Sequence, residues 1–179
     1  MAASLLNFVL FQARWFAAIL GGAAGWAVTG SLPGVITAAV HLGFFTGARL
    51  REAGLILAVT LLGLVIETAF MAGGVIAYTG TVPGQILPPV WIIAMWLAFG
   101  TLPNGSLKWL SGRWKLQVLL GAVFGPLSYL GGAKLGAATL PDPSFSALVA
   151  IGIGWGLAMP VIFLLAETIN GRPEVAART

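Results

Sequence analysis

The stretch LLGLVIETAFMAGG, residues 61–74, sets one glutamate, Glu67, inside an otherwise apolar run. Such a run is typical of a membrane-embedded helix, because about 20 apolar residues in helical form span the hydrocarbon core of a bilayer. A carboxyl group inside that core must be neutral, paired with a cation or turned toward a polar cavity, since an isolated charge is costly there. The surroundings of Glu67 therefore bear on both the fold and the function.

The composition extends this reading from one stretch to the whole chain. Of the 179 residues, 59% are hydrophobic and 8% are charged, against roughly 25% charged in an average soluble domain. Apolar runs of similar length recur throughout, and no segment between them is long enough for a soluble domain. We therefore expect an all-α, polytopic membrane protein in which residues 1–179 form a single transmembrane domain.

Glycines, prolines and charge clusters divide the chain into six expected membrane-spanning helices. The N-terminus lacks the basic start of a cleaved signal peptide, so the first run is interpreted as a retained helix. The predicted ranges are 5–27, 32–48, 53–79, 86–103, 114–138 and 146–168.

Basic residues favour one side of this arrangement. Seven of the nine Lys and Arg residues fall in the links at 49–52 and 104–113, just beyond the second link, or in the tail. The positive-inside rule then predicts that both termini are cytoplasmic. The basic residues do not form a continuous patch, so no nucleic-acid partner is expected despite a pI near 10.1.

The links on the other side resemble one another: GSLPG at 30–34, GTVPG at 80–84 and ATLPD at 138–142. Three copies of one helical hairpin would produce this pattern, and so would the ordinary preference of short turns for Gly, Ser, Thr and Pro. Gly-x-x-x-Gly pairs at 121/125 and 152/156 favour close helix packing, either within the chain or in a homo-oligomer or membrane complex.

Three ionisable residues fall near the middle of the first three predicted helices: Arg14, His41 and Glu67. Arg14 and Glu67 would form a neutral pair, and His41 could hydrogen-bond to either. One interpretation is a mid-membrane site or proton relay. The others are a polar clasp that only fixes helix packing, and an Arg14 side chain that extends to the interface. The candidate cavity-lining residues are Asn7, Gln12, Trp91, Trp96 and Tyr129.

Several kinds of chemistry are excluded by residue content. The chain has no cysteine and one histidine, which rules out thiolate metal sites, multi-histidine iron clusters and bis-histidine haem ligation. No metal-ligand pair is expected, and no cofactor is indicated. Axial ligation of one pigment or haem by His41 is the single arrangement of that kind left open.

Three further stretches carry a family resemblance: LLNFVLFQARWFAAILG (5–21), PPVWIIAMWLAFGTLPNGSLKWL (88–110) and GPLSYLGGAKLGAATLPDP (125–143). They resemble the bacterial inner-membrane family known as domain of unknown function 2878, over nearly the whole chain and with an acidic residue at the position of Glu67. Arg14 departs from that pattern, where the position is often small or apolar. The resemblance implies no established activity. The resemblance also implies a gene neighbourhood, in which genes of the family lie beside genes for cyclopropane-fatty-acid-synthase-like and flavin-oxidase-like proteins. Such neighbours would point to the modification or handling of membrane lipids.

Three functional hypotheses follow. The first is a bacterial inner-membrane protein that modifies or handles lipid acyl chains, with membrane lipids and lipid-modifying enzymes at the cytoplasmic face as its partners. The second is a small proton-coupled transporter in which Glu67 and His41 titrate. The third is a structural subunit of a membrane complex, in which the polar residues only hold helices together.

Overall fold

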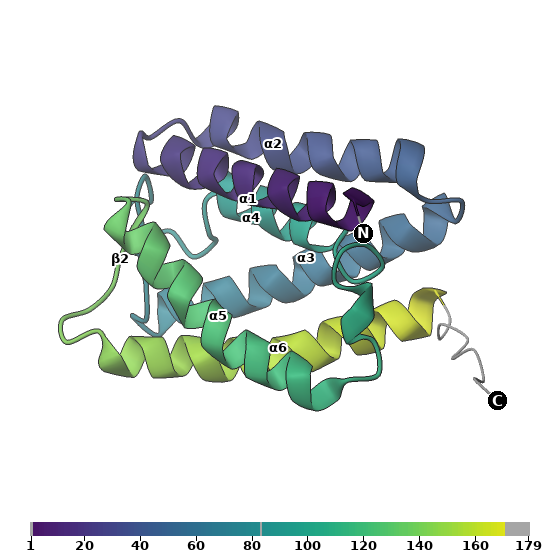
Figure 1. Cartoon of the computed structure of the whole chain (residues 1–179). Helices are drawn as coiled ribbons and strands as arrows, with labels where there is room; N and C mark the ends of the chain where they lie inside the picture. Colours follow the sequence, from purple (N-terminus) through teal and green to yellow (C-terminus); the bar gives the residue numbers. More distant parts are fainter. Residues whose placement is uncertain (1, 83, 171–179) are drawn as a thin grey trace.

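A computed structural model shows six α-helices packed as one bundle, and it describes residues 2–82 and 84–170, with the side chains of 2–11 and 27 left out of the description (Figure 1). The elements are α1 (Ala2–Ala23), α2 (Ala27–Val40), the π-helical turn η1 (His41–Phe45), α3 (Arg49–Ala72), β1 (Ala77–Tyr78), α4 (Val90–Phe99), the 3-10 turn η2 (Lys108–Leu110), α5 (Trp114–Lys134), β2 (Ala138–Thr139) and α6 (Phe145–Asn170).

The helices form two packed groups around α3. Helix α2 packs on α1 and α4, helix α5 packs on α6, and α3 contacts both α4 and α6. The core between them is built from large apolar side chains that are almost fully buried. They include Leu55, Val59, Trp91, Trp96, Ile151 and Ile162. Helices α1 and α5 sit on the same face of the bundle in Figure 1, one from each group.

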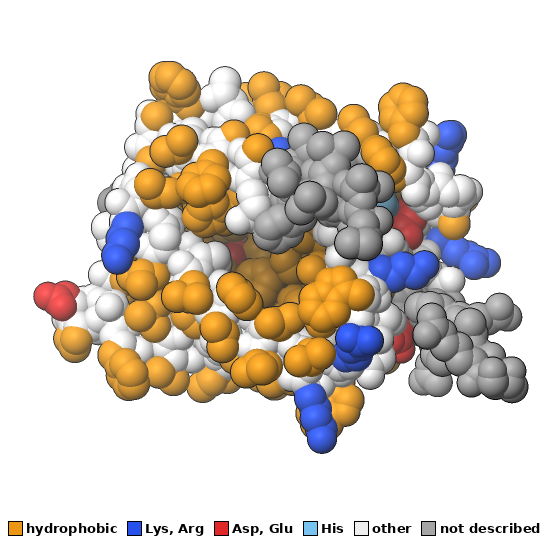
Figure 2. All heavy atoms as spheres, viewed as in Figure 1, with side chains coloured by type: hydrophobic (Ala, Val, Ile, Leu, Met, Phe, Trp, Pro, Cys, Tyr) orange, Lys and Arg blue, Asp and Glu red, His pale blue; other side chains and the backbone are white. Residues whose placement is uncertain are grey.

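Membrane embedding is supported by length and by the outer surface. Four segments are long and apolar enough to cross a membrane within the described part of the chain: Val28–Phe45, Arg49–Ala72, Trp114–Lys134 and Phe145–Asn170. Large apolar side chains point outward over the bundle, as Figure 2 shows on one face. A lipid environment explains an outer surface of this kind, since soluble monomers rarely expose large contiguous apolar patches.

The expectation of six spans meets a difficulty at α4. The predicted helix 86–103 is a helix of ten residues, about 15 Å long and half of the roughly 30 Å hydrocarbon core. Pro89 has an extended backbone (ψ 154°), so the helix begins only at Val90. Pro103 and Gly105 then lie in a run of turns that replaces the last helical turns.

Other predicted helices also end earlier than expected. Helix α1 ends at Ala23, shortly before Gly25 (φ 74°), and α2 gives way to η1 at His41. Glycines likewise stop α3 and α5. Gly74 (φ 66°) follows α3, and Gly136 (φ 84°) follows α5; both have the left-handed backbone that glycine adopts without a steric penalty. The chain beyond each glycine forms a short antiparallel pair, β1 with β2, in which Tyr78 lies opposite Ala138.

This pair joins the second and third of the similar links, but the first link does not match them. Residues 30–34 lie within α2, with Pro33 inside the helix, whereas the corresponding segments follow β1 and include β2. The structure therefore lends no support to three repeated hairpins.

The two ends of the bundle differ in charge. Helix α1 begins and α6 ends at the same end of the bundle (Figure 1). Most Lys and Arg side chains in Figure 2 gather at that end. We call it the basic end, and the opposite end, which carries β1 and β2, the strand end.

Two glycines of α3 provide a matched test of this packing. A Cβ at Gly63 would lie 2.0 Å from the Trp96 ring, whereas a Cβ at Gly54 would meet nothing within 4 Å. We expect Gly63→Ala to lower the free energy of unfolding in detergent by about 1–3 kcal/mol through overpacking. Gly54→Ala should be neutral or raise it by about 0.5–1 kcal/mol. Equal effects of the two changes would contradict the packing of α4 on α3.

Candidate functional site

Glu67 lies on α3 and is 2% exposed. Its Oε1 accepts hydrogen bonds from the indole Nε1 of Trp96 (2.9 Å) and the hydroxyl of Tyr129 (2.5 Å). Its Oε2 accepts one from the hydroxyl of Tyr78 (2.5 Å). The three donors come from α4, α5 and β1, so one carboxylate joins four elements. We call these four residues the Glu67 cluster.

Local structure places each donor. Tyr78 is fixed by the β1–β2 pair, and its ring meets Trp91 edge-on at 5.6 Å between centroids. Trp96 lies across Gly63 of α3, where any larger residue would collide with the ring. The Trp96 ring also stacks on the ring of Trp155 of α6, with 4.8 Å between the ring centroids.

The three described partners of the Glu67 carboxyl group are neutral side chains. No Lys, Arg or His atom of the described residues lies within 4 Å of the Glu67 oxygens. Hydrogen bonds to an ionised acceptor are about twice as strong as neutral ones, so three of them would offset part of the cost of ionising Glu67 in this site. Burial is the largest cause that raises the pKa of Tyr78 well above its usual value, and electrostatic interactions with Tyr129 and Glu67 follow. Tyr78 therefore keeps its proton at neutral pH and remains a donor.

A cavity of about 650 Å³ borders the Glu67 cluster, within the 300–1,000 Å³ range of small-molecule sites. Its walls are predominantly apolar and aromatic. Helix α1 contributes Trp15 and Ile19, and α5 contributes Phe124 and Leu127. Phe124 and Leu127 are also more than half exposed on the outside of the bundle. The cavity therefore opens sideways between α1 and α5, and Figure 2 shows the molecule hollowed there, with an apolar floor.

The cavity is elongated along the helices. On α5 its lining runs from Leu120 to Gly132, about 18 Å of helix axis. Glu67 lies five residues before the end of α3 at Ala72, about 7.5 Å from the strand end of that helix. At the other end, Leu107 and Leu110 close the cavity near the basic end. The cavity thus has a polar region around Glu67, near the strand end. Gln12 and Arg14 add polar groups on the α1 wall, and most of the remaining wall is apolar.

Two indole groups in the cavity wall have spare hydrogen-bonding capacity. The Nε1 atoms of Trp91 and Trp155 are buried and have no hydrogen-bond partner among the described residues. Both residues line the cavity. Buried N–H groups are usually paired, so both are candidates to donate to a ligand or to water.

Most predicted site residues meet at this cavity. Six of them line it: Gln12, Arg14, Glu67, Trp91, Trp96 and Tyr129. The side chain of Asn7 lies outside the described residues. Tyr78 was missed, because a helix was predicted through residue 79 and the strand pair that holds Tyr78 depends on a contact between distant segments.

The expected partners of the ionisable residues need correction. Arg14 donates from Nη1 to the hydroxyl of Thr37 on α2. The partners of Glu67 described above do not include Arg14. Tyr78, Trp96 and Tyr129 occupy the two carboxyl oxygens instead. His41 is not among the cavity-lining residues. It begins η1, after α2 has run toward the basic end, and is therefore displaced along the helices from Glu67.

His41 belongs to a second polar cluster, which the sequence did not predict. Its Nε2 lies 3.3 Å from Oε2 of Glu52. Asn104 donates to Oε1 of Glu52 at 2.7 Å, and Asn170 donates to the same atom at 3.2 Å. Glu52 falls in the predicted link at 49–52, beside two arginines. It is 6% exposed and joins η1, α3, the turns after α4 and α6, which makes it a structural clasp.

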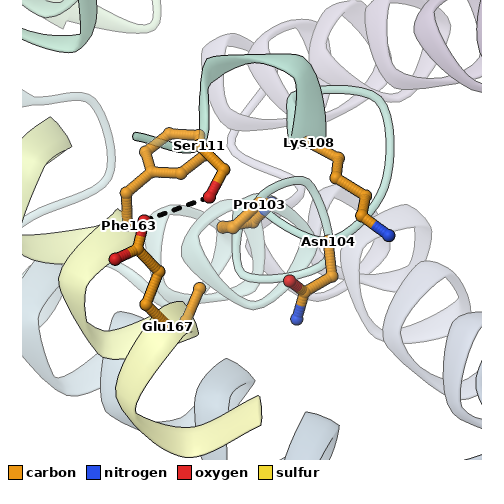
Figure 3. A pocket seen from close by; sticks show the side chains of 7 residues that line it. Pro103, Asn104, Lys108, Ser111, Phe163 and Glu167 are labelled. Atoms are coloured by element: carbon orange, nitrogen blue, oxygen red, sulfur yellow. Dashed lines mark hydrogen bonds between the residues drawn. The ribbon is translucent and has the colours of Figure 1, made fainter. Parts of the chain in front are cut away.

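A small pocket at the basic end is too small for a ligand (Figure 3). Ser111 donates to Oε1 of Glu167 at 3.0 Å across it, and Asn104 and Lys108 form the opposite wall. Its volume is about 10 Å³, roughly the space of one water molecule. No group of three or more metal-ligating side chains occurs among the described residues either.

The fold and the cavity define a class: an α-helical membrane protein with a laterally open cavity and one buried carboxylate in its wall. Residues 4–161 match the family described as protein of unknown function DUF2878, and the chain belongs to that family. No curated protein and no solved structure matches the chain. The functional argument therefore rests on the geometry of the cavity.

Glu67→Leu and Glu67→Gln separate polarity from shape in the Glu67 cluster. Leucine leaves three buried donors without an acceptor, at about 1–3 kcal/mol each before relaxation. We expect it to lower the free energy of unfolding in mixed micelles by about 2–4 kcal/mol. Glutamine still accepts from Trp96 and Tyr129 and donates to the Tyr78 hydroxyl, so the loss should be below about 1 kcal/mol. Circular dichroism during reversible unfolding measures both. Equal losses would show that the three donors do not depend on Glu67.

Proposed function

We propose that the protein binds the hydrocarbon chain of a membrane lipid in its central cavity and takes part in the handling or modification of membrane lipids. The observation that carries the proposal is the cavity itself, large, apolar and open sideways between α1 and α5. A cavity that opens into the bilayer admits a lipid directly from the membrane, where hydrocarbon chains are abundant. A soluble substrate would need an opening toward water.

The shape of the cavity suits a chain. Its lining follows α5 for about 18 Å, so an extended acyl chain can lie along the helix. Small-molecule sites combine mainly apolar walls with a few placed polar groups, and the Glu67 cluster supplies such groups near the strand end. The polar region can hold the head of a ligand while the apolar region holds its tail.

The basic end of the molecule supports the orientation and the partners in this proposal. Arg49 and Arg51 lie in the first turn of α3 and Lys108 begins η2, all at that end. By the positive-inside rule it faces the cytoplasm of a bacterial inner membrane, where basic residues attract anionic headgroups. Lipid-modifying enzymes would meet the protein on that side, and both termini would lie there.

One observation favours a second candidate, a proton-coupled carrier. Two tyrosine hydroxyls contact the Glu67 carboxylate at 2.5 Å, which forms a short chain of groups able to exchange protons inside the membrane. If the protein is a proton-coupled carrier, liposomes that contain it should show a pH-dependent proton flux, and Glu67→Gln should abolish that flux. Flux that is unaffected by this change would remove the carrier hypothesis.

Two leucines of α5 provide a matched test of lipid binding. Leu127 and Leu119 are 54% and 55% exposed, but only Leu127 lines the cavity. Tryptophan at Leu127 should fill the mouth between α1 and α5, and tryptophan at Leu119 should extend into bulk lipid. Native mass spectrometry of protein released from nanodiscs should show severalfold less retained lipid for Leu127→Trp than for Leu119→Trp. Equal retention by both variants and the wild type would contradict the proposal.

A further inference from the structure

The charge balance of the cavity raises a question that hydrocarbon binding alone does not answer. A hydrocarbon chain needs an apolar wall, yet Glu67 places an acidic side chain in that wall with neutral groups as its described partners. A cation beside Glu67 would favour its ionised form. Neutral donors compensate a buried anion only in part, because removing a charge from water costs several kcal/mol even after relaxation. A positively charged ligand group would complete the compensation.

The surroundings of Glu67 are aromatic on several sides. Trp155 stacks on Trp96, and Phe99 meets Trp155 at 5.2 Å between centroids. Tyr78 and Trp91 form a second edge-to-face contact. All five side chains line the cavity. Aromatic faces attract cations through the ring quadrupole, and clusters of such faces are the usual recognition site for quaternary ammonium groups.

From the carboxylate, the aromatic walls and the lateral opening, we infer that the ligand is a lipid-like ammonium compound, with its cationic head beside the Glu67 cluster and its hydrocarbon tail along α5. Glu67 lies about 7.5 Å from the strand end of α3, close to where a lipid head meets the hydrocarbon core. The tail then extends toward Leu120 in the apolar part of the cavity. This inference rests on the proposed function and names the ligand class of the same cavity.

Arg14 is the other charged residue of the cavity lining and must be counted. Its guanidinium donates to Thr37 on α2, whereas the Glu67 cluster is built from α3, β1, α4 and α5. Any repulsion between Arg14 and a cationic ligand head therefore acts from the α1 wall of the cavity, and not from the elements that hold Glu67. Removing it by Arg14→Gln should leave the preference for a cationic ligand unchanged or increase it.

The test uses three probes with the same twelve-carbon chain: dodecyltrimethylammonium, dodecanol and dodecyl sulfate. Five of the seven tryptophans line the cavity, so tryptophan fluorescence of nanodisc-reconstituted protein reports binding. We expect the cation to bind at least about tenfold more tightly than the alcohol, as aromatic and carboxylate contacts predict. The sulfate should bind more weakly than the alcohol. Affinities are compared after correction for partitioning into protein-free nanodiscs.

Glu52→Gln is the matched control, because Glu52 is the other buried glutamate of α3 and does not line the cavity. Glu67→Gln should remove the preference for the cation, and Glu52→Gln should keep it. Saturable binding of all three probes with equal affinity would overturn the inference and leave the proposed function intact. Binding of none of them would overturn both. If Glu67→Gln does not fold, the order of the three probes on the wild type decides the question.

Discussion

A carboxylate in the membrane region must find hydrogen-bond donors, and much of the structure depends on how Glu67 meets this constraint. Its three donors come from one full-length helix, one short helix and a two-residue strand. Two of the donors therefore fix elements that are weakly specified by themselves, the short helix α4 and the strand β1. The short helix α4 gains a contact through Trp96, and the loop that carries Tyr78 is held at the strand end. Removing the acceptor would release three elements together.

Close packing on one side of the bundle and an opening on the other have a common origin in residue size. A Cβ at Gly121 of α5 would lie 2.3 Å from the backbone oxygen of Trp155, and one at Gly152 of α6 would lie 3.1 Å from that of Ala122. These two helices therefore approach as closely as their backbones allow. Helix α1 packs mainly on α2 and α4. It approaches α5 through Trp15 and Ile19 near Gly131 and Gly132, and residues of both helices line the cavity. The glycine pairs at 121/125 and 152/156 are thus used within the chain.

Periodicity and composition predicted the helical class, the approximate ranges of most helices and six of the residues that line the cavity, because an apolar run and a buried polar residue are visible locally. What they could not predict depends on distant contacts. Tyr78 reaches Glu67 only because β1 pairs with β2. The pairing of Glu52 with Asn104 and Asn170 joins the start of α3, the turns after α4 and the end of α6. The short length of α4 is different, because the flanking Pro89 and Pro103 are visible in the sequence and were given too little weight. Charge complementarity predicted Arg14 as the partner of Glu67. The described partners are neutral groups instead, and nothing in the sequence indicates that they replace the arginine.

The cavity, its lateral opening and the buried carboxylate together describe a protein that takes an amphipathic molecule from the bilayer and holds it in a defined orientation. The most direct measurement is anomalous diffraction from crystals grown in a lipidic mesophase doped with a single-chain lipid that is brominated near the middle of its chain. The account predicts a bromine peak inside the cavity, between Phe124 of α5 and Trp15 of α1. Bromine peaks confined to the outer surface of the bundle, with none between α1 and α5, would contradict it.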